Sequence, residues 1–215
     1  MIQRSRFILL PAIMLLSLFS FGQGKNLPKM QAGIRAGANF ANFRALQNSS
    51  ILEHQNNTFI MVGAFAQVRI FKKFGLRAEI MSNPKGALVN YYDGNNVQVE
   101  AVQKLNYTDA AVSLVYNFRV LKVIGLYAFG GYGYESLTSA KNAIQTPYTS
   151  TQTVTDNFEK NAQSIIAGLG IRIRIDNINI MPEIRYLHGL TDVVKTNITT
   201  KNRVITASVG ISYTL

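Results

Sequence analysis

Residues 203–215, RVITASVGISYTL, determine the fold class, because their side chains alternate between two kinds of surface. The odd positions are apolar: Ile205, Ala207, Val209, Ile211, Tyr213 and Leu215. The even positions are small or polar: Thr206, Ser208, Gly210, Ser212 and Thr214. A period of two residues is typical of a β-strand with one apolar and one polar face. The stretch therefore predicts an amphipathic strand.

Earlier segments repeat this alternation, and after the first 22 residues no segment shows a helical period. The predicted strands cover about residues 30–40, 60–70, 75–80, 105–118, 126–135, 164–175 and 178–186. The connections are short near residues 72–74, 119–123 and 176–177, and long near 44–57, 83–103, 138–161 and 191–201. Eight strands with short turns at one end and long loops at the other predict an all-β, antiparallel up-and-down barrel.

The N-terminus predicts a secretory signal peptide. Arg4 and Arg6 precede an apolar run, and Ser20 and Gly22 place small residues at the −3 and −1 positions of a cleavage site. The apolar run is shorter than the roughly 20 residues that a membrane-spanning helix needs. We therefore expect a signal peptide over residues 1–22, a short periplasmic leader over 23–29 and a barrel over 30–215.

The composition argues against several kinds of site. The chain has 215 residues, a formal net charge of +11 and no cysteine, so it has neither disulfides nor thiolate metal ligands. No metal-ligand spacing or nucleotide-binding motif is present, and we expect no cofactor and no metal. The positive charge is spread over turns, loops and strands instead of forming a run, so we expect no nucleic-acid binding.

Alternation alone leaves open whether the apolar face points into a soluble barrel or outward into lipid. All eleven lysines fall in the leader, predicted turns, loops or strand ends, whereas the outer face of a soluble barrel would carry lysine. The polar face is rich in glycine, which leaves room for long side chains in a narrow interior. These features favour a transmembrane barrel.

Aromatic residues on the apolar face support the same choice. They form two bands around an aliphatic zone, as in the interfacial girdles of membrane barrels. One band lies near the short turns (Phe71, Phe74, Tyr116, Phe118 and Tyr213) and the other near the long loops (Phe40, Tyr132, Tyr134 and Tyr186). We expect a protein of the outer membrane of a Gram-negative bacterium, with short turns periplasmic and long loops extracellular.

Pro182 conflicts locally with this pattern, because it falls in the middle of a predicted strand. Every strand of a closed barrel is paired on both sides. The proline must therefore cost one ladder hydrogen bond or mark a bulge.

Charged residues on the polar face predict an ion-pair network inside the barrel. Counting from the short turns places five of them at similar depth: Arg35, Glu79, Arg172, Glu183 and Arg185. Eight strands leave an interior only wide enough for side chains, so such a network would plug the lumen. The alternative is a conducting or gated lumen.

Catalytic residues are not expected. His188 and Asp192 form the only candidate pair, near the loop end of a strand, and no nucleophile accompanies them. The other histidine, His54, lies in a predicted loop among Asn and Gln.

Several stretches resemble the PorT-like outer-membrane β-barrel family of Bacteroidetes-type bacteria. The most specific is EIRYLHGLT at residues 183–191, and GIRAGAN at 33–39 and LRAEI at 76–80 are similar as well. The resemblance implies the fold and the outer membrane, and some members serve type IX protein secretion. Two functions follow: a non-enzymatic envelope barrel that binds protein partners such as secretion components, or a narrow transport or ligand-binding barrel.

The end of the chain also resembles a known pattern. Ser208, Gly210, Tyr213 and Leu215 match the spacing of the C-terminal signal that outer-membrane barrels present to their assembly machinery. The resemblance implies that this machinery is a partner during insertion, and that outer-membrane lipid is a partner afterwards.

Overall fold

The computed structural model describes residues 30–45, 53–55, 57–92, 98–119, 121, 123–146, 150–153, 158–192 and 200–215. The predicted signal peptide and leader lie outside these residues. Among the described residues, no helix is long and apolar enough to cross a membrane. The strands are β1 (Met30–Ala45), β2 (Glu53–Gln55), β3 (Asn57–Phe71), β4 (Phe74–Ser82), β5 (Lys85–Tyr92), β6 (Gln98–Arg119), β7 (Ile124–Thr146), β8 (Ser150–Thr153), β9 (Asn161–Ile175), β10 (Ile178–Gly189) and β11 (Thr200–Thr214).

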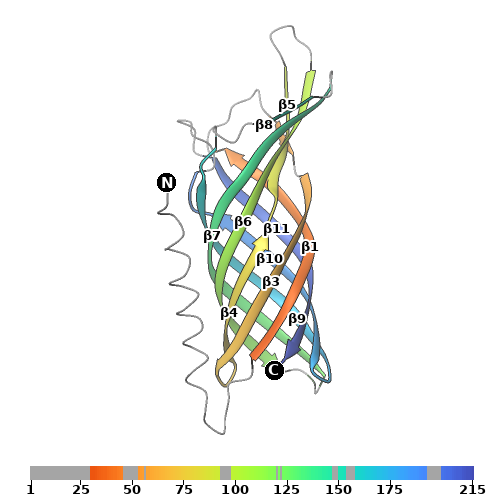
Figure 1. The fold of residues 1–215 in the computed structure, drawn as a ribbon, viewed down its shortest axis with the longest axis vertical. Helices are drawn as coiled ribbons and strands as arrows, with labels where there is room; N and C mark the ends of the chain where they lie inside the picture. Colours follow the sequence, from red (N-terminus) through yellow and green to blue (C-terminus); the bar gives the residue numbers. More distant parts are fainter. Residues whose placement is uncertain are drawn as a thin grey trace, which may run out of the picture.

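Eight of these strands close into an antiparallel barrel (Figure 1). The order around the barrel is β1, β3, β4, β6, β7, β9, β10 and β11, and each strand pairs with the next. β11 returns to pair with β1, from Gln31–Thr214 to Ala45–Thr200. The predicted up-and-down barrel is confirmed, and the structure shows that β11 closes it against β1.

The period of two residues fixes which side chains face outward. Ile34 and Leu169 are 68% and 66% exposed, while Arg35 beside Ile34 is buried in the lumen. Exposed aromatics lie near the short turns (Phe71, Phe74, Phe118 and Tyr213) and towards the other end (Phe40, Tyr132, Tyr134 and Tyr186). A closed barrel with an apolar belt between two aromatic bands is the form that suits a bilayer.

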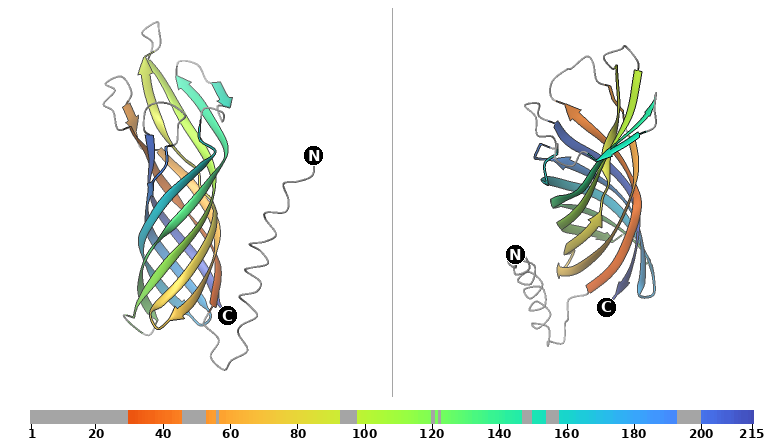
Figure 2. Two further views of the ribbon diagram at one scale, coloured as in Figure 1. Left: turned by 90° about the vertical axis from the view of Figure 1, so that its left-hand side faces the viewer. Right: turned by 45° about the horizontal axis from the view of Figure 1, so that its top comes forward.

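Some strands run well past their predicted ends at the end opposite the short turns (Figure 2). β6 and β7 pair as far as Glu100–Thr146, and β5 continues β4 along β6 after a break at Asn83 and Pro84. The 22 residues of β6 extend about 70 Å at ~3.3 Å per residue, far more than the ~25 Å apolar band of a barrel.

The predicted loops at residues 83–103 and 138–161 are therefore wrong over much of their length. They contain β5, the first residues of β6, the end of β7 and β8. A strand beyond the bilayer has no lipid-facing side, so its sequence lacks the apolar alternation that identifies a strand. Backbone pairing holds these extensions together, and near their base Leu137 and Ala140 of β7 pack in a small apolar cluster with Leu105 and Phe158.

Pro182 interrupts the wall of the barrel without shifting it. Across β9 and β10, Ile180 pairs with Ile173 and Glu183 pairs with Gly170, so the register is the same on both sides. Met181 and Pro182 have no ladder partner on β9, whereas Pro182 stays level with Val209 on β11. Of the two predicted outcomes, the structure shows the lost ladder pairing and not the bulge.

Two inward glycines on β9 make room for aromatic rings. A Cβ atom at Gly170 would lie 2.3 Å from Cζ of Tyr127, and one at Gly168 would lie 2.4 Å from Cζ of Phe129. The predicted space on the glycine-rich face is therefore filled here by two rings of β7. Arginine side chains stack on these rings in the middle of the lumen.

Candidate functional site: the charged lumen

Five charged side chains, here called the central network, meet in the middle of the barrel. They are Arg35 on β1, Arg77 and Glu79 on β4, and Glu183 and Arg185 on β10. Arg35 forms a bidentate pair with Glu183, with Nη1–Oε1 and Nη2–Oε2 distances of 2.6 and 2.9 Å. Its Nη1 also lies 2.8 Å from Oε1 of Glu79.

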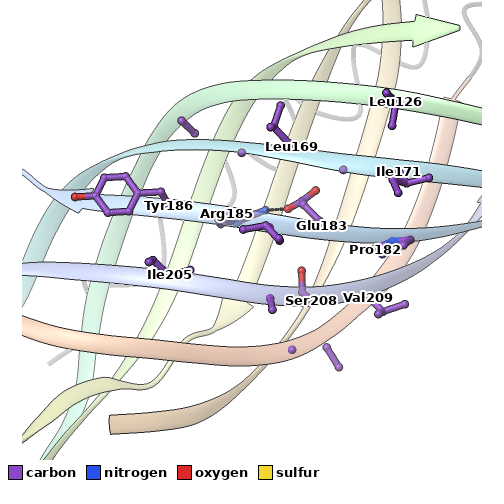
Figure 3. Close-up of a pocket in the computed structure, with 17 residues that line it drawn as sticks. Leu126, Leu169, Ile171, Pro182, Glu183, Arg185, Tyr186, Ile205, Ser208 and Val209 are labelled. Carbon is purple, nitrogen blue, oxygen red and sulfur yellow. Dashed lines mark hydrogen bonds and ion pairs between the residues drawn. The ribbon is translucent and has the colours of Figure 1, made fainter. Parts of the chain in front are cut away.

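The other two arginines complete the central network. Arg185 Nη2 lies 2.7 Å from Oε2 of Glu79 and 2.9 Å from Oε1 of Glu183, and Figure 3 shows the second contact behind the barrel wall. Arg77 Nη1 lies 2.7 Å from Oε2 of Glu183. Bidentate and charge-assisted hydrogen bonds of this kind offset the cost of removing the charges from water.

Neighbouring side chains hold the central network in place. The Tyr127 hydroxyl donates to Oε2 of Glu183 at 3.0 Å, and Nε of Arg77 donates to Oε1 of Gln67 at 3.1 Å. The guanidinium carbon of Arg77 lies 5.1 Å from the ring centres of both Tyr127 and Phe129. With hydrogen bonds and rings around it, the network occupies the lumen as a packed layer.

A second charged group, here called the lysine cluster, lies further from the short turns. Nζ of Lys85 is 2.6 Å from Oε2 of Glu135 and 3.2 Å from Oδ2 of Asp109. The Lys85 side chain is 0% exposed and stacks over the ring of Tyr107. Nδ2 of Asn83 donates to Asp109. One buried ammonium therefore forms ion pairs with two buried carboxylates.

A chain of amides joins the lysine cluster to the closing strands. Nδ2 of Asn39 donates to Oδ1 of Asn83 and to the carbonyl oxygen of Pro84, and Thr206 donates to Oδ1 of Asn39. The Asn83–Pro84 break between β4 and β5 is thus tied to β1 and β11 across the lumen. Side-chain hydrogen bonds therefore span the lumen at this level as well.

The short-turn end of the lumen has a different charge pattern. Nη1 of Arg172 donates to Oδ1 of Asn117 at 2.9 Å. Arg69, Arg172 and Arg174 line a cavity at this end of the barrel. Among the described residues, none of these three arginines forms an ion pair. Asn117 is held in turn by the carbonyl oxygen of Lys73, to which its Nδ2 donates at 3.0 Å.

Comparison of the sequence with protein families gives a match to the outer membrane protein beta-barrel domain over residues 21–195. The chain belongs to this family. A comparison with curated proteins found no significant relative. The family match covers more than half of the chain and agrees with the closed barrel, so this is an outer-membrane β-barrel protein.

Solved structures with a similar fold are outer-membrane barrels too. OprG from Pseudomonas aeruginosa is 10% identical with a TM-score of 0.52, over 90% of this chain and 99% of OprG. A major outer membrane protein from Thermus thermophilus is 11% identical with a TM-score of 0.53, over 86% of this chain and 99% of that protein. At these identities the likeness shows the fold alone.

In this outer-membrane barrel, four of the five residues predicted for the lumen network contact one another: Arg35, Glu79, Glu183 and Arg185. The prediction is wrong for Arg172. Glu183 is level with Gly170 across the β9–β10 ladder, so Arg172 lies two residues closer to the short turns. The β9–β10 ladder is symmetric about the turn at residues 176–177, so a count from that turn already separates Arg172 from Glu183 by two residues, and the prediction treated the two as one depth.

Two members of the charged lumen were missed by sequence reasoning. Alternation over residues 75–80 places Arg77 on the inward face but the depth count leaves it out of the network, although its long side chain reaches Glu183. Lys85 falls in the predicted loop at residues 83–103, whereas it lies on β5 and points inward. The useful signal was the nearby pair of inward carboxylates, Asp109 and Glu135, which needed a cation.

The barrel wall also carries an apolar hollow of about 830 Å³ on its outer face (Figure 3). Its outward-facing lining includes Leu169 on β9, Pro182 and Ile184 on β10, and Val209 on β11. These residues belong to the apolar belt, so the hollow opens toward lipid. Its lining also includes Glu183 and Arg185, so the hollow lies against the part of the wall that carries the central network.

The two histidines and the residues of the predicted C-terminal signal are the other residues that the sequence singled out. The Tyr186 hydroxyl lies 3.5 Å from Nδ1 of His188, and no ion pair joins His188 to Asp192 among the described residues. His54 lies in the short strand β2. Ser208 is buried and Gly210 faces inward, whereas Tyr213 and Leu215 are exposed. Their role as an assembly signal stays a prediction.

Proposed function

We propose that this outer-membrane barrel is a non-enzymatic envelope protein with a closed lumen, and that it acts by binding protein partners at its ends. The observation that supports a closed lumen is the central network, whose five charged side chains are at most 3% exposed and link β1, β4 and β10 across the interior. This packed layer supports the proposal that no continuous water path crosses the lumen.

The orientation is part of the proposal. We place the short turns in the periplasm and the extended ends of β5, β6 and β7 outside the cell, because bacterial barrels have short periplasmic turns and longer extracellular connections. The β5–β8 region then offers partners a surface beyond the bilayer.

The purified barrel is expected to give no steady single-channel conductance in a planar lipid bilayer. Ions would have to cross the buried central network, whose displacement would leave charges unpaired at a cost of several kcal/mol. A water-filled porin in the same bilayers is the positive control. A steady, large current through the barrel would overturn the closed-lumen proposal and favour the narrow transport barrel.

Type IX secretion components are the first partners we propose, on the strength of the PorT-like motifs at residues 33–39, 76–80 and 183–191. An affinity-tagged barrel, extracted from its outer membrane in mild detergent, is expected to co-purify with such components, and its deletion to impair processing of secreted proteins. A second tagged barrel from the same membrane is the control. A clean monomer together with unchanged secretion would contradict the partner proposal.

A further inference from the structure

The short-turn end of the barrel contains a cavity of about 330 Å³, here called the cationic mouth. Its lining comes from the end of β3 and the turn that follows it, from β9 and from the region where β6 leads into β7. The charged residues among the lining are all cations: Arg69, Lys72, Lys73, Arg172 and Arg174. Among the described lining residues there is no carboxylate.

This charge pattern sets the cationic mouth apart from the rest of the lumen. In the central network, Glu79 and Glu183 face three arginines, and in the lysine cluster two carboxylates face Lys85. Five like charges around one small cavity repel one another, and a bound anion relieves that repulsion.

Arg172 has hydrogen-bond donors without protein acceptors. Its Nη1 donates to Asn117, but its Nε and Nη2 are buried and have no hydrogen-bond partner among the described residues. Buried polar groups nearly always have a partner, so an unpartnered buried guanidinium edge is a feature that needs explanation. Asn117, fixed by the carbonyl oxygen of Lys73, holds this guanidinium in a set orientation.

The chemistry of the lining indicates which anion fits. Guanidinium groups match the oxygen geometry of phosphate with paired hydrogen bonds, and lysine adds a compact positive charge. The volume lies at the low end of the range for small-molecule pockets. Phe118 and Leu121 supply an apolar side to the same cavity.

We propose that the cationic mouth binds a phosphate group, with Arg69, Arg172 and Arg174 as its ligands. The phosphate belongs either to a soluble anion or to the headgroup of a phospholipid. Binding would hold the two turns and β9 together at this end of the barrel. The site is independent of whether the lumen conducts and of which proteins the barrel contacts.

Two titrations of the barrel in alkyl maltoside micelles distinguish the sources. Inorganic phosphate is titrated by calorimetry, and phosphatidylglycerol is titrated with native mass spectrometry of the lipid-bound barrel. The test variant is Arg69→Gln/Arg174→Gln, which changes two exposed side chains and leaves Arg172 in place. The matched control is Lys104→Gln/Lys141→Gln, which removes two exposed charges at the opposite end.

Wild type is expected to bind in at least one titration, and the arginine variant to bind at least about tenfold more weakly, since hydrogen bonds to charged groups carry this much affinity. The lysine control should stay within about twofold, because charges more than a Debye length away are largely screened. Binding of phosphatidylglycerol alone identifies the lipid headgroup as the source, and binding of inorganic phosphate alone identifies a soluble anion. No binding in either titration, or equal weakening in both variants, would overturn the proposal.

Discussion

Replacing Glu183 by glutamine is expected to lower the free energy of unfolding by about 3–5 kcal/mol, the usual cost of breaking a buried ion pair from one side. Glu183 accepts hydrogen bonds from Arg35, Arg77 and Arg185, as well as from Tyr127. Without its charge, three guanidinium groups share the single carboxylate of Glu79. Urea unfolding of the barrel refolded in lipid vesicles, followed by its mobility shift on gels, measures the loss.

Two further variants make this result specific. Glu159→Gln makes the same chemical change at an exposed position and is expected to change stability by less than about 0.5 kcal/mol. Arg77→Gln combined with Glu183→Gln removes a cation together with the anion, so the pair should cost clearly less than the sum of its single changes. Additive losses would mean that the two side chains do not act as one network.

Replacing Lys85 by methionine is expected to be about as damaging, with a loss of about 3–5 kcal/mol. The ammonium is the only cation within ion-pair distance of Asp109 and Glu135 among the described residues. Methionine fills a similar volume but leaves two buried carboxylates facing each other without a positive charge. The same urea unfolding experiment in lipid vesicles measures the loss.

Lys104→Met is the matched control for this change. Lys104 lies on β6 level with Gly86, next to Lys85 along the ladder, but its side chain is exposed. We expect little change there, within about 0.5 kcal/mol. Adding Asp109→Asn to Lys85→Met should recover part of the stability, because one of the two unpaired charges is then gone. Equal losses in Lys85→Met and Lys104→Met would contradict a structural role for the buried ammonium.

The sequence predicted the inward and outward faces well, because that property is local. Successive side chains of a strand point to opposite faces, so one apolar residue such as Ile34 fixes the direction of Arg35. The prediction failed where no lipid touches the strand. Beyond Asn83 the extensions of β5, β6 and β7 lack an apolar side, and the sequence therefore reads as loop.

The membership of the charged clusters was only partly predictable. Arg172 and Arg77 both face inward, yet only Arg77 contacts Glu183. Arg172 lies two residues nearer to the short turn than Glu183, whereas Arg77 reaches Glu183 across the lumen from β4, and a count along one strand does not contain that cross-lumen contact. Lys85 shows the same limit, because the break at Pro84 hides that the chain returns to the barrel wall.

By itself, then, the sequence determined that this protein is an eight-stranded barrel with a lipid-facing belt. The barrel follows from a repeat of two residues and from the lengths of the connections, and the lipid-facing belt follows from the positions of lysine and of the aromatic residues. Only the tertiary structure decided which charges meet in the lumen and which, among the described residues, stand without carboxylates at the cationic mouth. Ion pairing needs heads of side chains within about 4 Å, and that distance is set by the tilt and register of strands far apart in the chain.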